Sequence, residues 1–447
     1  MSFPDNFIWG AASSAYQIEG AWKEGGKGPS IWDEFSHIPG NVLHNHTGDV
    51  SCDAYHRFSE DVDLMSQMGL GAYRFSISWP RILPEGQGRI NQKGLAYYDE
   101  LIDLLLERGI TPYATLFHWD LPLALHKKGG WLLRDTAHAF AEYANVIAKH
   151  FDGRIQNYIT INEPQCFMFT GYSLGVHAPG LRLPPATVLQ CMHNMLLAHG
   201  ESVQALRGAS HAPLQISMAS TGNLYYPAAE TPKCLAAAES RAFFLNEENW
   251  IYNHHWCWDA ALLGHYPEQA PSFMQEFAAS VPPEDFKTIR QDLDFMGINI
   301  YHGMAVNEFG KEVPPCPGFP RTAFNWPITP ELMHYSCLWM HKRYRLPIFI
   351  TENGLSCRDR IHLDGQVHDP GRIDFLHRYL KELGKAADEG VPLLGYFHWS
   401  LMDNFEWNNG YDERFGLVYT DFATGDRTLK DSGRWYAETV RQNGKNL

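Results

Sequence analysis

Short apolar runs alternate with longer amphipathic stretches along the whole chain. The runs are rich in β-branched and aromatic residues and begin near residues 7, 72, 111, 158, 214, 295, 347 and 393. Such runs, when turn residues bound them, predict strands that are buried on both faces of a parallel sheet. The intervening stretches carry apolar residues three and four positions apart, which predicts helices. The clearest of these helices are expected over residues 91–109, 135–151 and 374–390.

The alternation of runs and stretches predicts the fold class. Eight strand-like runs separated by helical segments indicate an α/β fold, the (β/α)8 TIM barrel, because parallel neighbours need a crossover helix. The runs extend over the chain, so we expect one barrel domain covering residues 1–447. A minimal barrel has about 250 residues, and we expect the surplus to form long βα loops on the carboxyl-terminal face. These loops are predicted at residues 20–60, 165–190, 221–250, 303–330 and 403–430.

Composition narrows the possible partners. Lys and Arg total 36 against 51 Asp and Glu, which gives a formal net charge of −15, and no long basic run occurs. Nucleic acids and anionic membranes bind basic surfaces, so we expect neither as a partner. Hydrophobic residues make up 45% of the chain and charged residues 19%, as in proteins with a large folded core.

The cysteines and the N-terminal segment give information on the cellular compartment of the protein. The eight cysteines are scattered and form no CxxC pair, which favours free thiols in a reducing compartment. The opening segment MSFPDNFIWG has no basic and apolar signal pattern, and no apolar run approaches the length of a membrane span. We therefore expect a soluble cytoplasmic protein.

Two acidic residues stand where buried strands end. The run LPIFITENG ends on Glu352, and the run YITINEP ends on Asn162 and Glu163. A charge at such a position is costly to bury unless it has a use. Other predicted strands also end in polar or aromatic groups, which are Gln17, Arg74, His118, Trp119, Asn299, Tyr301 and Trp399.

Taken together, the strand-end residues indicate a catalytic site and not a layer of packed side chains. Each one alone fits a salt bridge or a packing role, but a packing layer does not need two acids, an arginine, amides and large aromatics together. Cleavage of a glycosidic bond needs one carboxylic acid to protonate the leaving oxygen and one carboxylate at the anomeric carbon. The sequence does not give the separation of Glu163 and Glu352, which decides between retention and inversion.

Several ordered motifs are similar to those of glycoside hydrolase family 1, the β-glucosidase family. They are FIWGAASSAYQIEG, KGPSIWDEF, YRFSISWPRI, FHWDLP, INEP, ITENG and WSLMDNFEWNNGY, which together cover nearly the full chain. The resemblance implies a retaining β-glucosidase with β-galactosidase and β-fucosidase side activity. Glu352 would be the nucleophile and Glu163 the general acid/base. Small β-glucosides and cello-oligosaccharides would be the substrates.

The resemblance also assigns supporting and binding positions. Arg74 and Tyr301 would lie beside Glu352, with Asn299 as a further supporting residue. The sugar would be held by Gln17, His118, Trp119, Asn162, Trp399, Glu406 and Trp407. The retaining mechanism uses no metal or cofactor, and neither HNH at 44–46 nor HHWCW at 254–258 offers a complete ligand set. We expect neither a metal nor a cofactor.

The aglycone side departs from the family pattern. Trp326 stands where the family has a stacking tryptophan, but Pro327 follows it in place of a polar residue. Cys166, Phe167 and His177 belong to the loop that shapes the pocket entrance, so the sequence leaves the aglycone open.

Two alternative functions are kept. One is a 6-phospho-β-glycosidase, although such relatives carry a Ser, Lys and Tyr set where this chain has Glu406 and Trp407. The other is a catalytically silent sugar-binding protein, which would be expected to lack one of the two glutamates.

Overall fold

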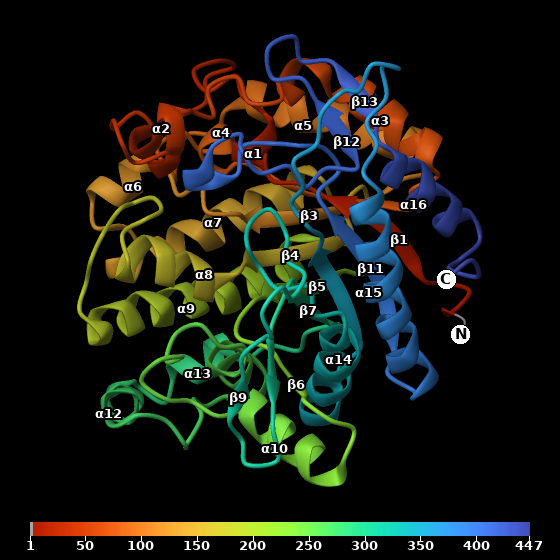
Figure 1. The fold of residues 1–447 in the computed structure, drawn as a ribbon. Coiled ribbons are helices and arrows are strands. Elements are labelled where there is room, and N and C mark those ends of the chain that lie inside the picture. The colour runs from red at the N-terminus through yellow and green to blue at the C-terminus, as the bar shows by residue number, and fades with distance from the viewer. Residues whose placement is uncertain (1–2) are drawn as a thin grey trace.

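The barrel dominates the computed structural model, which describes residues 3–447. Within those residues eight parallel strands close into a barrel, as predicted (Figure 1). Each barrel strand is hydrogen-bonded to the barrel strand that follows it along the chain, and the last is paired with the first. The strands are β1 (Ile8–Ala12), β2 (Ala72–Ser76), β3 (Thr111–Phe117), β4 (Asn157–Asn162), β5 (Gln215–Ser220), β7 (Met296–Asn299), β10 (Ile348–Asn353) and β11 (Leu393–Trp399).

Helices connect the strands and surround the barrel (Figure 1). The segment from β1 to β5 contains α1 (Ala15–Ile18), α2 (Ile31–Ser36), η1 (Leu43–Asn45), α3 (Ala54–Met68), α4 (Trp79–Ile82), α5 (Gln92–Glu107), α6 (Leu123–Lys127), η2 (Gly130–Leu132), α7 (Asp135–His150), α8 (Pro164–Met168), the π-helical turn η3 (Phe169–Ser173) and α9 (Pro185–Ala209). The remainder contains α10 (Pro232–Ala242), α11 (His255–Trp258), η4 (Asp259–Leu263), α12 (Ser272–Ser280), α13 (Asp285–Ile289), α14 (Glu331–Tyr344), α15 (Pro370–Asp388), η5 (Trp407–Asn409) and α16 (Asp431–Arg441).

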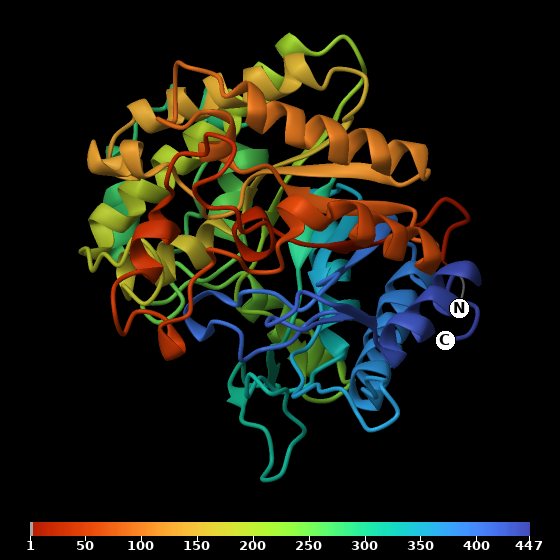
Figure 2. The ribbon, with the colours of Figure 1, turned by 90° about the horizontal axis from the view of Figure 1, so that it is seen from above.

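Small accessory sheets lie in the loops that follow the barrel strands. The loops after β5 and β7 supply β6 (Tyr225–Pro227), β8 (Met304–Val306) and β9 (Glu312–Val313), which form one small sheet. The loop after β11 supplies the antiparallel pair β12 (Val418–Thr420) and β13 (Arg427–Leu429). The teal segment after β8 projects from the body of the molecule (Figure 2). The sequence did not predict these strands, because two or three residues are too few to show a period.

Aromatic side chains fill the barrel interior below its carboxyl-terminal end. Phe349 stacks on Phe397 with ring centroids 4.6 Å apart, and Tyr113 packs edge-on against Phe397 at 5.1 Å. Gly10 lets this layer form, because a Cβ there would overlap the Phe397 ring and the Ala72 carbonyl. The barrel interior is therefore packed with side chains in this layer and is not an open pore.

The first and last barrel strands meet at a seam between β1 and β11. Ile8 to Ala12 pair in parallel with Gly395 to Trp399. The Tyr436 hydroxyl of α16 donates a hydrogen bond to the Gly10 carbonyl (2.9 Å), and the Trp9 indole donates one to Asn443 (2.8 Å). The segments around Trp9 and Asn443, near the two ends of the described chain, consequently lie side by side (Figures 1 and 2).

Two local predictions need correction. Gln17 lies in α1 and not at the end of the first strand, because β1 stops at Ala12 and the Ser76 hydroxyl of β2 accepts the Ala15 N–H (2.7 Å) as the helix begins. The helix expected from residue 374 begins at Pro370, whose fixed φ suits the first turn of a helix. Among residues 3–447 no helix is both long and apolar enough to cross a membrane.

Candidate active site

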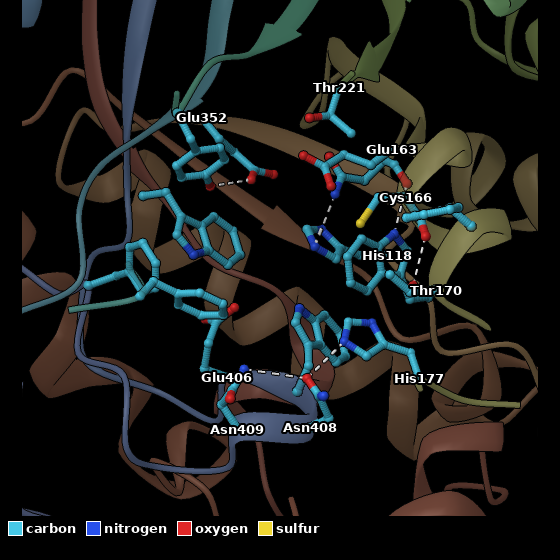
Figure 3. A pocket seen from close by; sticks show the side chains of 18 of the residues that line it. His118, Glu163, Cys166, Thr170, His177, Thr221, Glu352, Glu406, Asn408 and Asn409 are labelled. Atoms are coloured by element: carbon cyan, nitrogen blue, oxygen red, sulfur yellow. Dashed lines mark hydrogen bonds between the residues drawn. The ribbon is translucent and has the colours of Figure 1, made fainter. Parts of the chain in front are cut away.

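A cavity of about 480 Å³ opens at the carboxyl-terminal end of the barrel. Glu163 follows β4 directly, and Glu352 is the penultimate residue of β10. Both side chains line the cavity, and their carboxyl groups face one another across it (Figure 3). The structure thus places both predicted strand-end glutamates in one pocket.

Charged and hydroxyl groups hold Glu352. The Arg74 guanidinium donates to its Oε1 at 2.6 Å, and the Tyr301 hydroxyl donates to its Oε2 at 2.8 Å. Arg74 is itself fixed, since it also donates to the Thr115 hydroxyl (3.1 Å) and to the Thr351 carbonyl (2.9 Å). Burial raises the pKa of Glu352, while Arg74 and Tyr301 oppose that rise by stabilising the carboxylate.

Glu163 has a neutral partner. The Asn299 amide donates to its Oε1 at 2.8 Å. Burial, and then the negative charge of Glu352, raise the pKa of Glu163 to about 8. The Cys166 side chain lies next to it in the pocket (Figure 3). These contacts therefore favour the proton on Glu163 and the negative charge on Glu352.

Asn162 links the acids to the histidine of the pocket. Its Oδ1 accepts from Arg74 at 2.7 Å and from Asn299 at 3.2 Å, which fixes the orientation of the amide. Its Nδ2 must then donate to His118 Nε2, 3.1 Å away. Burial, with a smaller contribution from Arg74, lowers the pKa of His118 well below its usual value, so the ring is neutral. The remaining proton is on Nδ1, which is buried and has no hydrogen-bond partner among residues 3–447, while the His118 ring lines the cavity.

Aromatic rings form one wall of the cavity. Trp399 stacks on His118 with centroids 5.6 Å apart, and Trp119 packs on Trp407 at 4.6 Å. The Trp119 indole N–H is already used, since it donates to the Asn162 carbonyl at 3.0 Å. These residues therefore offer ring faces, and the C–H surface of a sugar packs on such faces.

Glu406 and Gln17 meet at the side of the cavity. Glu406 lines it, and burial, with a smaller effect of the Glu352 charge, raises the pKa of Glu406 to about 8. Gln17 was expected to line the cavity, but it is fully buried behind Glu406. Its amide donates to Glu406 Oε2 (3.4 Å), to the Phe405 carbonyl (2.9 Å) and to Asn404 (3.1 Å). Gln17 thus supports Glu406 from the α1 side.

The sequence profile described as Glycosyl hydrolase family 1 matches residues 1–445. The chain belongs to glycosyl hydrolase family 1. It is 44% identical to Beta-glucosidase A of Thermotoga maritima, with 99% of this chain and 98% of that protein aligned. It is 38% identical to the Bifunctional beta-D-glucosidase/beta-D-fucosidase of Bifidobacterium breve, with 98% of both covered. The structure of the Thermotoga maritima beta-glucosidase in complex with glucoimidazole superposes with a TM-score of 0.90 at 43% identity, over 99% of both chains.

The outer part of this family 1 pocket was only partly predicted. Trp326, Cys166 and His177 line it, whereas Phe167 does not, because it is buried against Phe117 with centroids 5.2 Å apart. Phe169, two residues later, lines the cavity instead. Sequence reasoning missed the remaining lining residues, which come from loops and from the short helical turns η3 and η5: Thr170, Thr221, Tyr252, Phe324, Asn408, Asn409 and Phe415.

Proposed function

We propose that this chain is a retaining β-glucosidase that releases terminal, non-reducing β-D-glucosyl residues from small β-glucosides and cello-oligosaccharides. Side activity on β-galactosides and β-fucosides belongs to the proposal. The observation that carries it is the unequal environment of two buried carboxyls in one pocket. Glu352 contacts a guanidinium and a phenol, whereas Glu163 contacts a neutral amide.

In the first step the Glu163 carboxyl gives its proton to the leaving oxygen as the bond from the anomeric carbon to that oxygen breaks. Glu352 forms a bond to the anomeric carbon from the opposite face. The negative charge of Glu352 is consumed in this bond. One cause of the raised pKa of Glu163 then disappears, and its carboxylate can act as a base.

In the second step Glu163 accepts a proton from water, whose oxygen attacks the anomeric carbon. The bond to Glu352 breaks, and the nucleophile is restored. Two inversions give net retention. Arg74 and Tyr301 can act on Glu352 in both steps, since Arg74 donates to Oε1 and Tyr301 to Oε2, and one of these two oxygens bonds to the anomeric carbon and later leaves it.

The sugar contacts belong to the same proposal. His118 would donate from Nδ1, Asn162 and Glu406 would bind hydroxyls, and Trp399 and Trp407 would pack on the ring. Trp326 would stack on the aglycone. Gln17 and Trp119 would act mainly through Glu406 and Asn162, because their polar groups are already hydrogen-bonded there. A cytoplasmic location is proposed as well, supported by eight cysteines that are all free thiols.

The decisive experiment follows hydrolysis of an aryl β-glucoside by NMR. We expect β-glucose as the first product, before mutarotation. Glu352→Ala should lower turnover by roughly four to six orders of magnitude, and azide should restore activity while giving α-glucosyl azide. The same aryl glucoside bearing a 6-phosphate should be a poor substrate. Early α-glucose, or a Glu352→Ala variant with a tenth of normal activity, would contradict the proposal.

A further inference from the structure

Glu406 and Trp407 both stand on one loop, residues 404–412, which we call the sugar loop. Hydrogen bonds within the loop close a tight turn, from Glu406 N–H to the Gly410 carbonyl (2.6 Å) and from Asn409 N–H to the Glu406 carbonyl (2.9 Å). Trp407 and Gly410 have φ of +49° and +58°. The positive φ of Trp407 is an unfavourable backbone conformation for a residue with a side chain, so contacts with the surrounding structure must stabilise the turn.

A histidine from a distant part of the chain contacts this turn. Tyr411 N–H donates to His46 Nδ1 at 3.2 Å, and the two rings pack with centroids 5.1 Å apart. A Cβ on Gly410 would overlap His46, so the imidazole lies directly on the turn. The Tyr411 hydroxyl donates to the neighbouring Thr47 carbonyl at 2.7 Å.

We propose that His46 is a positioning residue for the sugar site: its neutral Nδ1 fixes Tyr411 and, through Gly410, the placement of Glu406. This inference rests on the proposed function, because the role of Glu406 in holding the sugar is part of that function. His46 itself does not line the cavity.

The contact requires a neutral imidazole. A protonated ring has no free nitrogen lone pair and cannot accept the Tyr411 N–H. Burial, and then the neighbouring His44, lower the pKa of His46, while Asp412 opposes them. The titratable groups that face it are His44 and Asp412, and His44 Nε2 lies 3.6 Å from a carboxylate oxygen of Asp412. The sugar loop is thus expected to stay fixed at neutral pH and to loosen as acid protonates His46.

The test compares two variants at one position. His46→Asn keeps an acceptor, since asparagine Oδ1 can occupy the place of imidazole Nδ1, but it does not titrate. His46→Leu fills similar space without an acceptor. With p-nitrophenyl β-glucoside we expect the leucine variant to lose about three- to tenfold in kcat/KM, the range of one lost hydrogen bond, and the asparagine variant to stay within about twofold. The loss should be smaller on the β-fucoside, which has no C6 hydroxyl for Glu406.

The control is His44→Asn, on the same segment. His44 has a φ of +57°, which asparagine tolerates, and this variant should leave the ratio of glucoside to fucoside kcat/KM unchanged. In the wild type that ratio should fall toward acid pH, while in His46→Asn it should stay flat over the same range. If the His46→Leu variant does not fold, the pH dependence of this ratio in wild type and in His46→Asn still tests the inference.

The outcomes separate the two claims. An unchanged ratio in His46→Leu, or a loss in His46→Asn as large as in His46→Leu, overturns the positioning role. An equal loss in His44→Asn does so too, because the effect would then belong to the whole segment. A wild-type protein without activity on either glycoside overturns the proposed function instead.

Discussion

At the scale of single residues, Glu163 should determine how strongly the rate depends on the leaving group. It should also determine how kcat/KM falls at alkaline pH. Glu163→Gln should retain much of its rate of glycosyl-enzyme formation on 2,4-dinitrophenyl β-glucoside, whose leaving group needs no proton. The rate on methyl β-glucoside and on cellobiose should fall far more, because their leaving oxygens need the proton. Because the pKa of Glu163 is raised to about 8, wild-type kcat/KM should fall as pH rises through that value and the acid form is lost.

The measurement is kcat/KM from pH 5 to 10 for both substrate kinds in wild type and variant. The alkaline limb should vanish in Glu163→Gln on the dinitrophenyl substrate. Equal losses on activated and unactivated glucosides would assign the proton transfer to another group.

Glu406 should distinguish sugars by their C6 hydroxyl. Burial raises the pKa of Glu406 to about 8, so its carboxyl is mostly neutral at pH 7, and each neutral hydrogen bond to a sugar hydroxyl contributes about 0.5–1.5 kcal/mol. One decade in kcat/KM corresponds to about 1.4 kcal/mol, so the loss of two such bonds in Glu406→Ala should lower kcat/KM on glucosides about tenfold, and less on fucosides. Steady-state kinetics on the two p-nitrophenyl glycosides check this, and equal losses would mean that Glu406 does not contact C6.

At the scale of elements, a buried ion cluster anchors the segment after β11. Asp403 accepts from Lys430 Nζ (2.6 Å), from Arg414 (2.7 Å) and from the Gly416 N–H (2.9 Å). Asp403 and Lys430 are fully buried. Lys430 also pairs with Asp359 at 2.5 Å, so removing Asp403 leaves this buried lysine partly compensated. We therefore take the lower end of the about 3–5 kcal/mol that breaking a buried pair costs.

Asp403→Ala should thus lower the free energy of unfolding by roughly 3 kcal/mol, measured by urea denaturation. The control is Asp374→Ala on α15, whose carboxylate forms an exposed pair with Arg378 at 2.8 Å. That variant should change stability by less than about 1 kcal/mol. Similar losses in both variants would show that burial does not set the cost.

The elements also show what the sequence could and could not reveal. The barrel strands were predictable because burial on both faces leaves a continuous apolar run, and strand-end residues such as Glu163 and Glu352 converge by topology alone. Helix α1 was missed because a hydroxyl from another strand caps it. Phe167 was expected at the entrance because the sequence does not fix which face of α8 points inward. Loop residues such as Tyr252 reach the pocket through tertiary contacts that carry no local signal.

At the scale of the whole molecule, the single-domain organisation remains a prediction. If residues 3–447 form one cooperative unit, loss of helical circular dichroism and loss of activity on heating should coincide. Deoxynojirimycin, present in one Thermotoga maritima beta-glucosidase structure, should move both together, by about 2.7 kcal/mol of stability at a hundred times its Kd. Two separate transitions, only one of which responds to the inhibitor, would indicate two domains.

Because β1 pairs with β11, the barrel can close, and the active site can form, only late in the synthesis of the chain. A ribosome makes Gln17 389 residues before its partner Glu406. At about 5–20 residues per second the interval is on the order of 20–80 s. During that time β1 has no β11 beside it, and the pocket lacks the wall that Trp399 and Trp407 supply. A chain whose synthesis stops before β11 cannot close the barrel. Catalytic activity is therefore expected only from chains that have been synthesised beyond β11.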